Sequence, residues 1–209
     1  VLKVGKPDVG AANNNGATSM ACELICSMLA RRIGLPVPDY FIVDIPFALG
    51  LVEPDPEIAK LLAQNSGKHF GCRHLVGFAE WNPLSTVRTD TTLNRLEEVL
   101  NFDSIILNAD RRDANPNLLY DGTNFALIDH SLVLPTDPLT LALMGKDQLY
   151  TDDQVRDHCT FSTLQRKQRQ FAAVSDQWKT EITANELNDL RAHIPIEWEE
   201  NSGDHDRMF

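Results

Sequence analysis

The segment NADRRDANPNLLYDGTNFALIDHS, residues Asn108–Ser131, combines acidic and amide side chains with a stretch that then turns strongly apolar. Its second half predicts two short strands joined at Asp121-Gly122, a dipeptide typical of hairpin turns. Asp110 precedes the hairpin, Asn115 follows five residues later, and Asp129 comes directly after the apolar run FALI. The hairpin is therefore expected to return Asp129 toward Asp110 and Asn115.

These three positions supply the groups that phosphoryl transfer requires. Such a site uses one Asp near the accepting hydroxyl and a few hard oxygen ligands for magnesium, which binds carboxylates, carbonyls and phosphate oxygens. Asp110 is the candidate catalytic residue, and Asn115 and Asp129 are the candidate metal ligands. Asn117 is a second candidate ligand. Asp and Asn are also common turn formers, so an ordinary polar turn is an equal alternative on spacing alone.

Two further charged residues favour the phosphoryl-transfer interpretation. Lys3 ends a predicted strand, where a cation would meet nucleotide phosphates. Glu23 lies on the expected core side of a helix predicted over Thr18–Ile33, and a buried Glu is uncommon unless it is paired. We expect Lys3 to pair with Glu23, as a strand lysine and a helix glutamate do in protein kinases. Taken singly, each charge would more often be an ordinary surface residue.

The remaining pattern predicts a mixed α/β half followed by a mainly helical half. Strands are expected in the runs DYFIVDIPF and HFGCRHLVGF, on either side of the short helix PEIAKLLAQ. A long apolar stripe predicts the helix that leads into the segment with Asp110. Besides Thr18–Ile33, the expected helices are Pro56–Gln64, Thr91–Leu107, Asp152–Cys159, Ser162–Lys179 and Ala184–His193.

Composition limits the classes of function. A chain of 209 residues with 43% hydrophobic content can bury one substantial core or two small ones. The four cysteines form no C-x-x-C pair, so buried free thiols are expected rather than a zinc site or disulfides. A formal net charge of −11 disfavours binding to nucleic acid. No apolar run approaches the roughly 18 residues of a membrane span, and no signal peptide is evident, so we expect a cytoplasmic protein.

The sequence resembles the HipA-like kinases, relatives in fold of the protein and phosphatidylinositol kinases. The motifs that carry the resemblance are the strand Lys, the run ELICSMLARRIGLPVP with its Glu, then FDSIILNADRRDANPNLL, LIDHS and a short IPxEW. The similarity extends from Lys3 to Trp198. It implies an α/β (α+β) protein with two lobes, a small mixed lobe over residues 1–77 and a mainly helical catalytic lobe over residues 78–209.

The resemblance also implies a role for each candidate residue. Lys3 would contact the α and β phosphates of ATP, with Glu23 holding it. Asp110 would orient or deprotonate the acceptor hydroxyl, and Asn115 and Asp129 would bind magnesium. The run HFGCRHLVGF would lead into the linker between the lobes. Adenine is therefore expected near four consecutive residues, Arg73, His74, Leu75 and Val76.

The sequence departs from the protein-kinase pattern at several points. No H-R-D precedes the site, and His130-Ser131 stand where protein kinases have Phe-Gly after the metal-binding Asp. The phosphate-covering loop expected ahead of Lys3 is also missing, so either the chain starts after it or the run VGKPDVGAANNNG replaces it. Arg111 and Arg112 either neutralise the transferred phosphate or form salt bridges with nearby acidic residues, Asp103 or Asp113.

The activity implied is ATP- and magnesium-dependent phosphorylation of a protein Ser or Thr by a bacterial kinase of toxin or regulatory type. An inhibitory protein partner is expected with it. Three alternatives stay open at this point: a small-molecule or lipid kinase with the same fold, a kinase-shaped binding module without turnover, and a scaffold with no nucleotide site.

Overall fold

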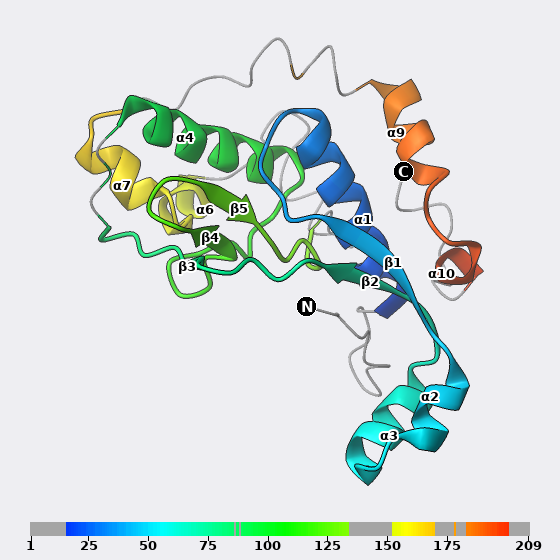
Figure 1. Ribbon diagram of the computed structural model, residues 1–209. Coiled ribbons are helices and arrows are strands. Elements are labelled where there is room, and N and C mark those ends of the chain that lie inside the picture. The colour runs from blue at the N-terminus through cyan, green and yellow to red at the C-terminus, as the bar shows by residue number, and fades with distance from the viewer. Residues whose placement is uncertain are drawn as a thin grey trace.

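The computed structural model describes residues 16–85, 87, 89–133, 152–169, 178 and 183–200 (Figure 1). Its helices are α1 Gly16–Arg32, α2 Phe47–Val52, α3 Pro56–Gln64, α4 Asp90–Ile105, α6 Asp152–Asp157, α7 Phe161–Arg166, α9 Ala184–Arg191 and α10 Ile196–Glu200. Its strands are β1 Tyr40–Ile45, β2 Gly67–Cys72, β3 Ala79–Glu80, β4 Leu118–Tyr120 and β5 Phe125–Leu127. The expected mixed α/β composition is confirmed, whereas the division into two kinase lobes stays a prediction.

Helix α1 ends where the sequence predicts, because Gly34 adopts a left-handed conformation with φ +80°. Leu35 N donates to Ala30 O at 2.8 Å and Gly34 N to Arg31 O at 3.2 Å, which is the Schellman arrangement that closes a helix. The helix is apolar on two sides. One side joins the main core through residues such as Cys26, and the other forms a second cluster with Phe70 of β2, Ile194 and Trp198.

Strands β1 and β2 form an antiparallel ribbon, with Tyr40 opposite Cys72 and Ile45 opposite Gly67. The run HFGCRHLVGF is strand only as far as Cys72, which corrects the expected extent. Arg73 N still donates to Asp39 O at 2.7 Å, but no described strand pairs with the residues that follow. A turn containing Gly77, at φ +83°, then leads the chain to β3.

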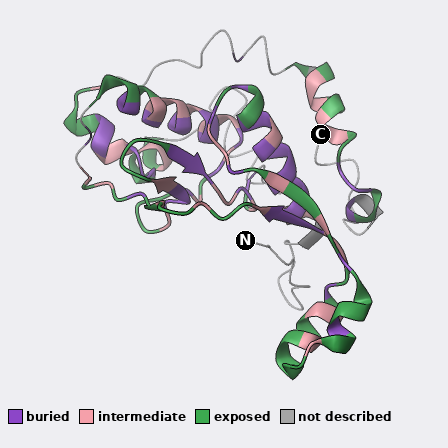
Figure 2. Cartoon of the chain, in the orientation of Figure 1, coloured by how far each residue is buried: buried purple, intermediate pink, exposed green. Residues whose placement is uncertain are grey.

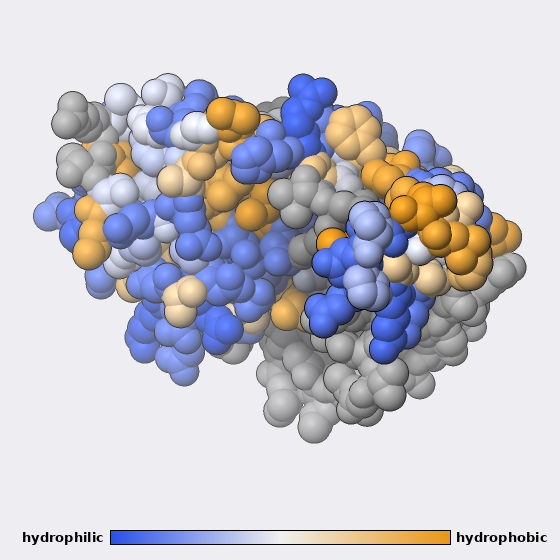
Figure 3. All heavy atoms as spheres, turned by 60° about the horizontal axis from the view of Figure 1, so that its bottom comes forward, coloured by the Kyte–Doolittle hydropathy of each residue, from blue (hydrophilic) through white to orange (hydrophobic). Residues whose placement is uncertain are grey.

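Helices α2 and α3 form a hairpin between β1 and β2 that projects from the body of the molecule (Figure 1). They cross closely at Gly50, where an added Cβ would lie 2.8 Å from Ala59 O. Asp55 caps α3 by accepting from the backbone N of Glu57 and Ile58. Most of the hairpin is exposed (Figure 2), and orange atoms gather on the right of the face in Figure 3, where its apolar side chains contribute. The exposed apolar residues of the hairpin are Phe47, Leu49, Leu51, Val52, Ile58 and Leu61.

The predicted hairpin after Asp110 is confirmed as β4 and β5, which pair antiparallel with Leu118 opposite Leu127. Its loop runs from Asp121 to Asn124, and Gly122 has φ +98°. Asp121 Oδ1 accepts from the backbone N of Thr123 and of Asn124 at 2.8 and 2.6 Å, which fixes this four-residue loop. The short strand β3 pairs on the other edge of β4.

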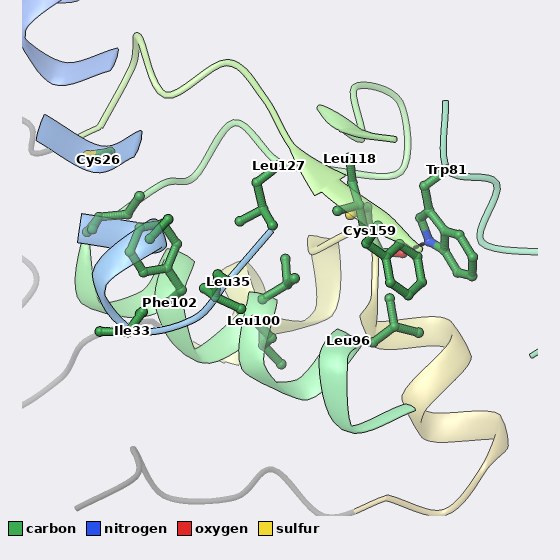
Figure 4. Close-up of a cluster of buried hydrophobic side chains, with 14 of the residues drawn as sticks. Cys26, Ile33, Leu35, Trp81, Leu96, Leu100, Phe102, Leu118, Leu127 and Cys159 are labelled. Atoms are coloured by element: carbon green, nitrogen blue, oxygen red, sulfur yellow. Dashed lines mark hydrogen bonds between the residues drawn. The ribbon is translucent and has the colours of Figure 1, made fainter. Parts of the chain in front are cut away.

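The main core lies between α4 and the β3-β4-β5 sheet (Figure 4). Trp81 is almost fully buried, meets Tyr120 and Phe125 edge-on, and donates from Nε1 to Cys159 O at 3.1 Å. The four cysteines are free, as expected, and three are buried. Burial raises the pKa of Cys22 to about 12, and the nearby Glu23 adds to this rise, so the thiol stays protonated.

The prediction of a helix over Ser162–Lys179 is wrong for residues 167–169. Helix α7 stops at Arg166 because Gln168 turns left-handed at φ +54° and Arg169 N donates to Leu164 O at 3.1 Å. This is again a Schellman closure, formed here without glycine. The rest of the expected helix falls largely outside the described residues. None of the helices in the described ranges is long and apolar enough to cross a membrane.

Candidate active site

Asp110 lies in a tight turn at the end of α4. Leu107 has φ +56°, an uncommon conformation for a bulky residue, and Asn108 N then donates to Asp103 O at 2.8 Å. The side chain of Asn108 is buried and bridges the turn: Nδ2 donates to Asp103 Oδ1 at 3.0 Å, and Oδ1 accepts from Asp110 N at 3.2 Å. Asn108 therefore holds the backbone of Asp110 against the last turn of α4.

The structure brings Asp110 together with both candidate amide ligands. Asn115 Nδ2 donates to Asp110 Oδ2 at 2.8 Å, and Asn117 Nδ2 donates to the same oxygen at 3.3 Å. The other carboxylate oxygen, Oδ1, lies 3.4 Å from Arg112 NH2, whose side chain is largely exposed. One oxygen of Asp110 is therefore fixed by two amides, while the second lies near the exposed Arg112 side chain.

Asp129 follows β5 in a left-handed conformation, with φ +58°. Ser131 Oγ donates to Asp129 Oδ1 at 2.6 Å, and Ser131 N lies 3.5 Å from the same oxygen. Strained backbone of this kind in a non-glycine residue concentrates at functional sites, where the surrounding structure maintains it. Asn117, with φ +44°, shares this feature.

A buried ionic network lies behind the site. Arg111 Nε is 2.5 Å from Asp103 Oδ2, and His158 Nε2 is 2.9 Å from the same oxygen. Neither side chain of the Arg111–Asp103 pair is exposed. Burial acts to raise the pKa of Asp103, but the Arg111 guanidinium and the His158 contact outweigh it, so the pKa lies below its ordinary value. Asp103 is therefore ionised at neutral pH.

Arg111 links the Asp110 turn to the end of β5. Its NH1 donates to the backbone carbonyls of Asn117 and, at 3.2 Å, of Ile128, the residue before Asp129. Ile128 N in turn donates to Asn117 O at 3.1 Å. Of the two roles left open for Arg111, the structure gives the salt bridge to Asp103, and Arg112 pairs with Asp110 itself.

The segment around His158 holds the Asp110 turn from its other side. His158 forms an isolated bridge with Arg112, and Cys159 N donates to Arg111 O at 3.2 Å. His158 Nδ1 lies 3.3 Å from Thr160 N and 2.9 Å from Thr160 Oγ1, and its Nε2 lies 2.9 Å from Asp103 Oδ2. His158 therefore ties this segment to Asp103.

A pocket opens beside these residues, between α1, the β1–β2 ribbon and β5. Apolar side chains form much of its wall, and Glu23, Asp129 and His130 lie along it as well. Of the residues expected near adenine, Arg73, His74 and Leu75 line the pocket, whereas Val76 does not and is 88% exposed. Besides Leu75, apolar residues of the wall are Pro38, Tyr40, Phe70, Leu119, Leu127 and Ile128.

Glu23 is buried on α1, as expected, and reaches the segment that follows Asp129. Its Oε2 accepts from the backbone N of His130 at 2.8 Å, and His130 Nδ1 lies 3.7 Å from the same oxygen. Lys3 falls outside the described residues, so its pairing with Glu23 stays a prediction. The same carboxylate thus already ties α1 to the backbone that follows Asp129.

The chemistry of the side chains present suits magnesium. Carboxylate and amide oxygens are the ligands this ion accepts, and it binds through few protein groups when phosphate oxygens complete its shell. Asp129 supplies a carboxylate, and the amide oxygens of Asn115 and Asn117 receive no hydrogen bond from the residues described. Within the same ranges no cluster of three or more His, Cys, Asp or Glu side chains is arranged for a metal.

The sequence prediction does not include His158, because His158 is distant in sequence from Asp103 and no local pattern connects them. It includes His130 only as the residue that stands where protein kinases have Phe, and Asp103 only as one of two partners for Arg111 or Arg112.

Comparison with known families matches residues 9–208, nearly the whole chain, to the HipA-like kinases. Searches of curated proteins and of solved structures find no match. The family match covers both the pocket and the Asp110 turn, and it confirms the resemblance seen in the sequence motifs. The chain belongs to the HipA-like kinase family.

Proposed function

We propose that this chain transfers the γ-phosphoryl group of ATP to the hydroxyl of a protein Ser or Thr, with magnesium at the site. The observation that carries the proposal is the cluster of Asp110, Asn115 and Asn117, which Ile128 N joins to the segment with Asp129 by donating to Asn117 O. Family membership supports phosphoryl transfer in general. The pocket beside Asp129 supports a nucleotide, because its mostly apolar walls suit a base and Glu23 and Asp129 also line it.

Each residue has a defined task in this proposal. Asp110 Oδ1 accepts a hydrogen bond from the acceptor hydroxyl, and takes its proton as the hydroxyl oxygen bonds to the γ phosphorus and ADP leaves. The amides of Asn115 and Asn117 keep Asp110 Oδ2 occupied, so the carboxylate presents one oxygen. Asp129, with Asn115 or Asn117, would hold magnesium, which neutralises phosphate charge.

The acceptor is assigned by analogy with the family, and two alternatives differ in measurable ways. A small-molecule or lipid kinase would label a non-protein product, and a binding module would take up nucleotide without turnover. We therefore propose incubation with ATP labelled in the γ phosphate and magnesium, alone and with bacterial extract. Label in a polypeptide supports the protein-kinase proposal, and label only in lipids or small molecules contradicts it.

Nucleotide binding is expected to be visible as thermal stabilisation. A ligand that binds only the folded state raises stability by RT ln(1 + [L]/Kd), or about 2.7 kcal/mol at 100 times Kd. For a protein of this size that corresponds to a melting temperature higher by roughly 5–10 °C. The measurement is a thermal unfolding scan with ATP and magnesium, with ADP and with no ligand. Absence of any shift would count against both the kinase and the binding-module proposals.

Replacement of Asp129 tests the metal role. Asp129→Asn keeps the size of the side chain and a hydrogen-bond acceptor for Ser131, but removes the negative charge that attracts magnesium. We expect nucleotide affinity in magnesium to fall about tenfold or more, with affinity in the absence of metal unchanged. Titration of ATP with and without magnesium measures both. Equal loss under the two conditions would contradict a metal role.

A further inference from the structure

The run IPIEW, residues Ile194–Trp198, carries part of the family resemblance but does not belong to the Asp110 turn. It leads from α9 into α10, and both helices lie beside α1 (Figure 1). Ile194, Pro195 and Trp198 are buried, whereas Ile196 and Glu197 are exposed. Trp198 N donates to Pro195 O at 2.9 Å, which closes the turn between the buried residues. The segment therefore directs its large apolar side chains into the protein.

These side chains join α1 to the β1–β2 ribbon. Ile194 and Trp198 pack in the second core cluster with Phe70 of β2 and one side of α1. Trp198 Nε1 donates to Lys68 O at 2.7 Å, and Lys68 Nζ lies 2.8 Å from Glu197 Oε1. The segment thus contacts β2 through its backbone as well as through a side chain of each sign. The buried residues that α1 contributes to the cluster are Met20, Ala21, Leu24 and Ile25.

The same cluster reaches the pocket. Tyr40, Phe70 and Cys72 line the pocket, and all three also pack in or against the cluster. Tyr40 lies opposite Cys72, and Phe70 precedes Cys72 by two residues, so the three share one face of the ribbon. A two-stranded ribbon is marginally stable by itself and depends on the element it packs against. The place of this pocket wall is therefore set by the packing of the ribbon on α1 and Trp198.

We propose that Trp198 is a positioning residue for the nucleotide: it holds the β1–β2 ribbon against α1 and so keeps the pocket wall where the base of ATP binds. Trp198 acts through the residues of the wall and not by touching ATP. Glu23 lines the pocket from the helix that the segment holds. The inference rests on the proposed function, because it assigns a determinant of the affinity for ATP.

Trp198→Ala should weaken ATP binding about fivefold or more, the size of a typical coupling between distinct sites. At saturating ATP, the rate of phosphoryl transfer should stay within about twofold of wild type, because a change confined to binding raises KM and leaves kcat. Asn108, Asn115 and Asn117 still hold Asp110 in the variant. The measurements are an ATP titration and transfer rates over a range of ATP concentrations, at a temperature where circular dichroism shows the variant folded.

Two further variants separate positioning from a general loss of stability. Trp198→Phe keeps an aromatic ring in the cluster but loses the donor to Lys68 O, so its affinity for ATP should lie between those of wild type and Trp198→Ala. Leu164→Ala also removes a fully buried side chain, but from α7 in the main core, and it should leave the affinity at the wild-type value. If Trp198→Ala does not fold, Ile194→Ala replaces it in the same measurements.

The possible failures are distinguishable. Unchanged ATP affinity in the folded variant, or an equal loss in Leu164→Ala, would overturn the positioning role and leave the proposed function intact. A lower transfer rate at saturating ATP with unchanged affinity would overturn it as well. A wild-type protein that shows no response to ATP would instead reject the proposed function, and the positioning role with it.

Discussion

Asp110→Asn should retain ATP and magnesium binding and lose phosphoryl transfer by about 10²- to 10⁴-fold, the contribution of a positioned general base. Asn is the same size, so the hydrogen bonds from Asn115 and Asn117 have a similar oxygen to reach. It cannot take a proton from the acceptor hydroxyl. The measurement is the rate of label transfer from ATP, with nucleotide affinity determined in parallel by thermal shift.

A matched control is available in the same segment. Asp121→Asn makes the same chemical change in the exposed β4–β5 loop, where an Asn side chain also accepts the backbone hydrogen bonds of Thr123 and Asn124. It should leave transfer and binding unchanged. Undiminished transfer by Asp110→Asn would remove Asp110 from the catalytic role, whereas loss of both binding and transfer would indicate a structural role instead.

Arg111→Ala should give a large loss of stability, about 3–5 kcal/mol, because it leaves the Asp103 carboxylate buried without its cation. The same change removes the donor to the Asn117 and Ile128 carbonyls. Urea unfolding, followed by circular dichroism, measures the free energy of unfolding. Arg156→Ala, which breaks an exposed pair with Asp153, is the control and should change it little.

A double replacement separates the two roles of Arg111, which are to neutralise Asp103 and to hold the backbone before Asp129. Arg111→Met combined with Asp103→Asn removes both buried charges, so its loss of stability should be smaller than the sum of the two single losses. Phosphoryl transfer should not recover with stability, because the methionine cannot hold the backbone before Asp129. Additive losses of stability, or recovery of transfer in the double variant, would contradict the assigned role of Arg111.

The Asp103 carboxylate also predicts a pH dependence. Its pKa in the folded protein lies below the ordinary value of 3.8. The ionised Asp103 carboxylate therefore contributes its full stabilisation at pH values above the ordinary pKa. This stabilisation is lost as the pH falls through the pKa of the folded state. The difference in unfolding free energy between the wild type and Asp103→Asn should thus shrink as the pH falls below about 4.

The elements that the sequence predicts correctly have local causes. Gly34 marks the end of α1, Pro56 begins α3, and Asp121-Gly122 marks the β4–β5 loop. Each depends on the conformational preference of one or two residues. Helix α2 was missed because its six residues are too few to establish a period, and their apolar character continues that of β1. Helix α7 ends at Arg166, ahead of the left-handed Gln168, with no glycine to signal it.

The candidate site likewise contains residues that local sequence predicts and residues that it does not. Asp110, Asn115 and Asp129 follow from spacing within one segment, and the structure joins the first two directly and ties the third through Arg111 and Ile128. His158 belongs to the site through its contact with Asp103, which is 55 residues away in sequence, and a contact so distant leaves no local pattern.

The cluster formed by α1, β2 and α10 bears on how the chain reaches its folded state during synthesis. Trp198 packs in this cluster with Ile25 and donates from Nε1 to Lys68 O at 2.7 Å, so one of the earliest helices is completed by one of the last. A ribosome must therefore release the chain through Trp198 before the second apolar side of α1 can be fully buried. Contacts so distant in sequence slow folding, and an N-terminal fragment ending at Gly77 would expose Met20, Leu24 and Phe70. Such a fragment is expected to require a chaperone or to aggregate.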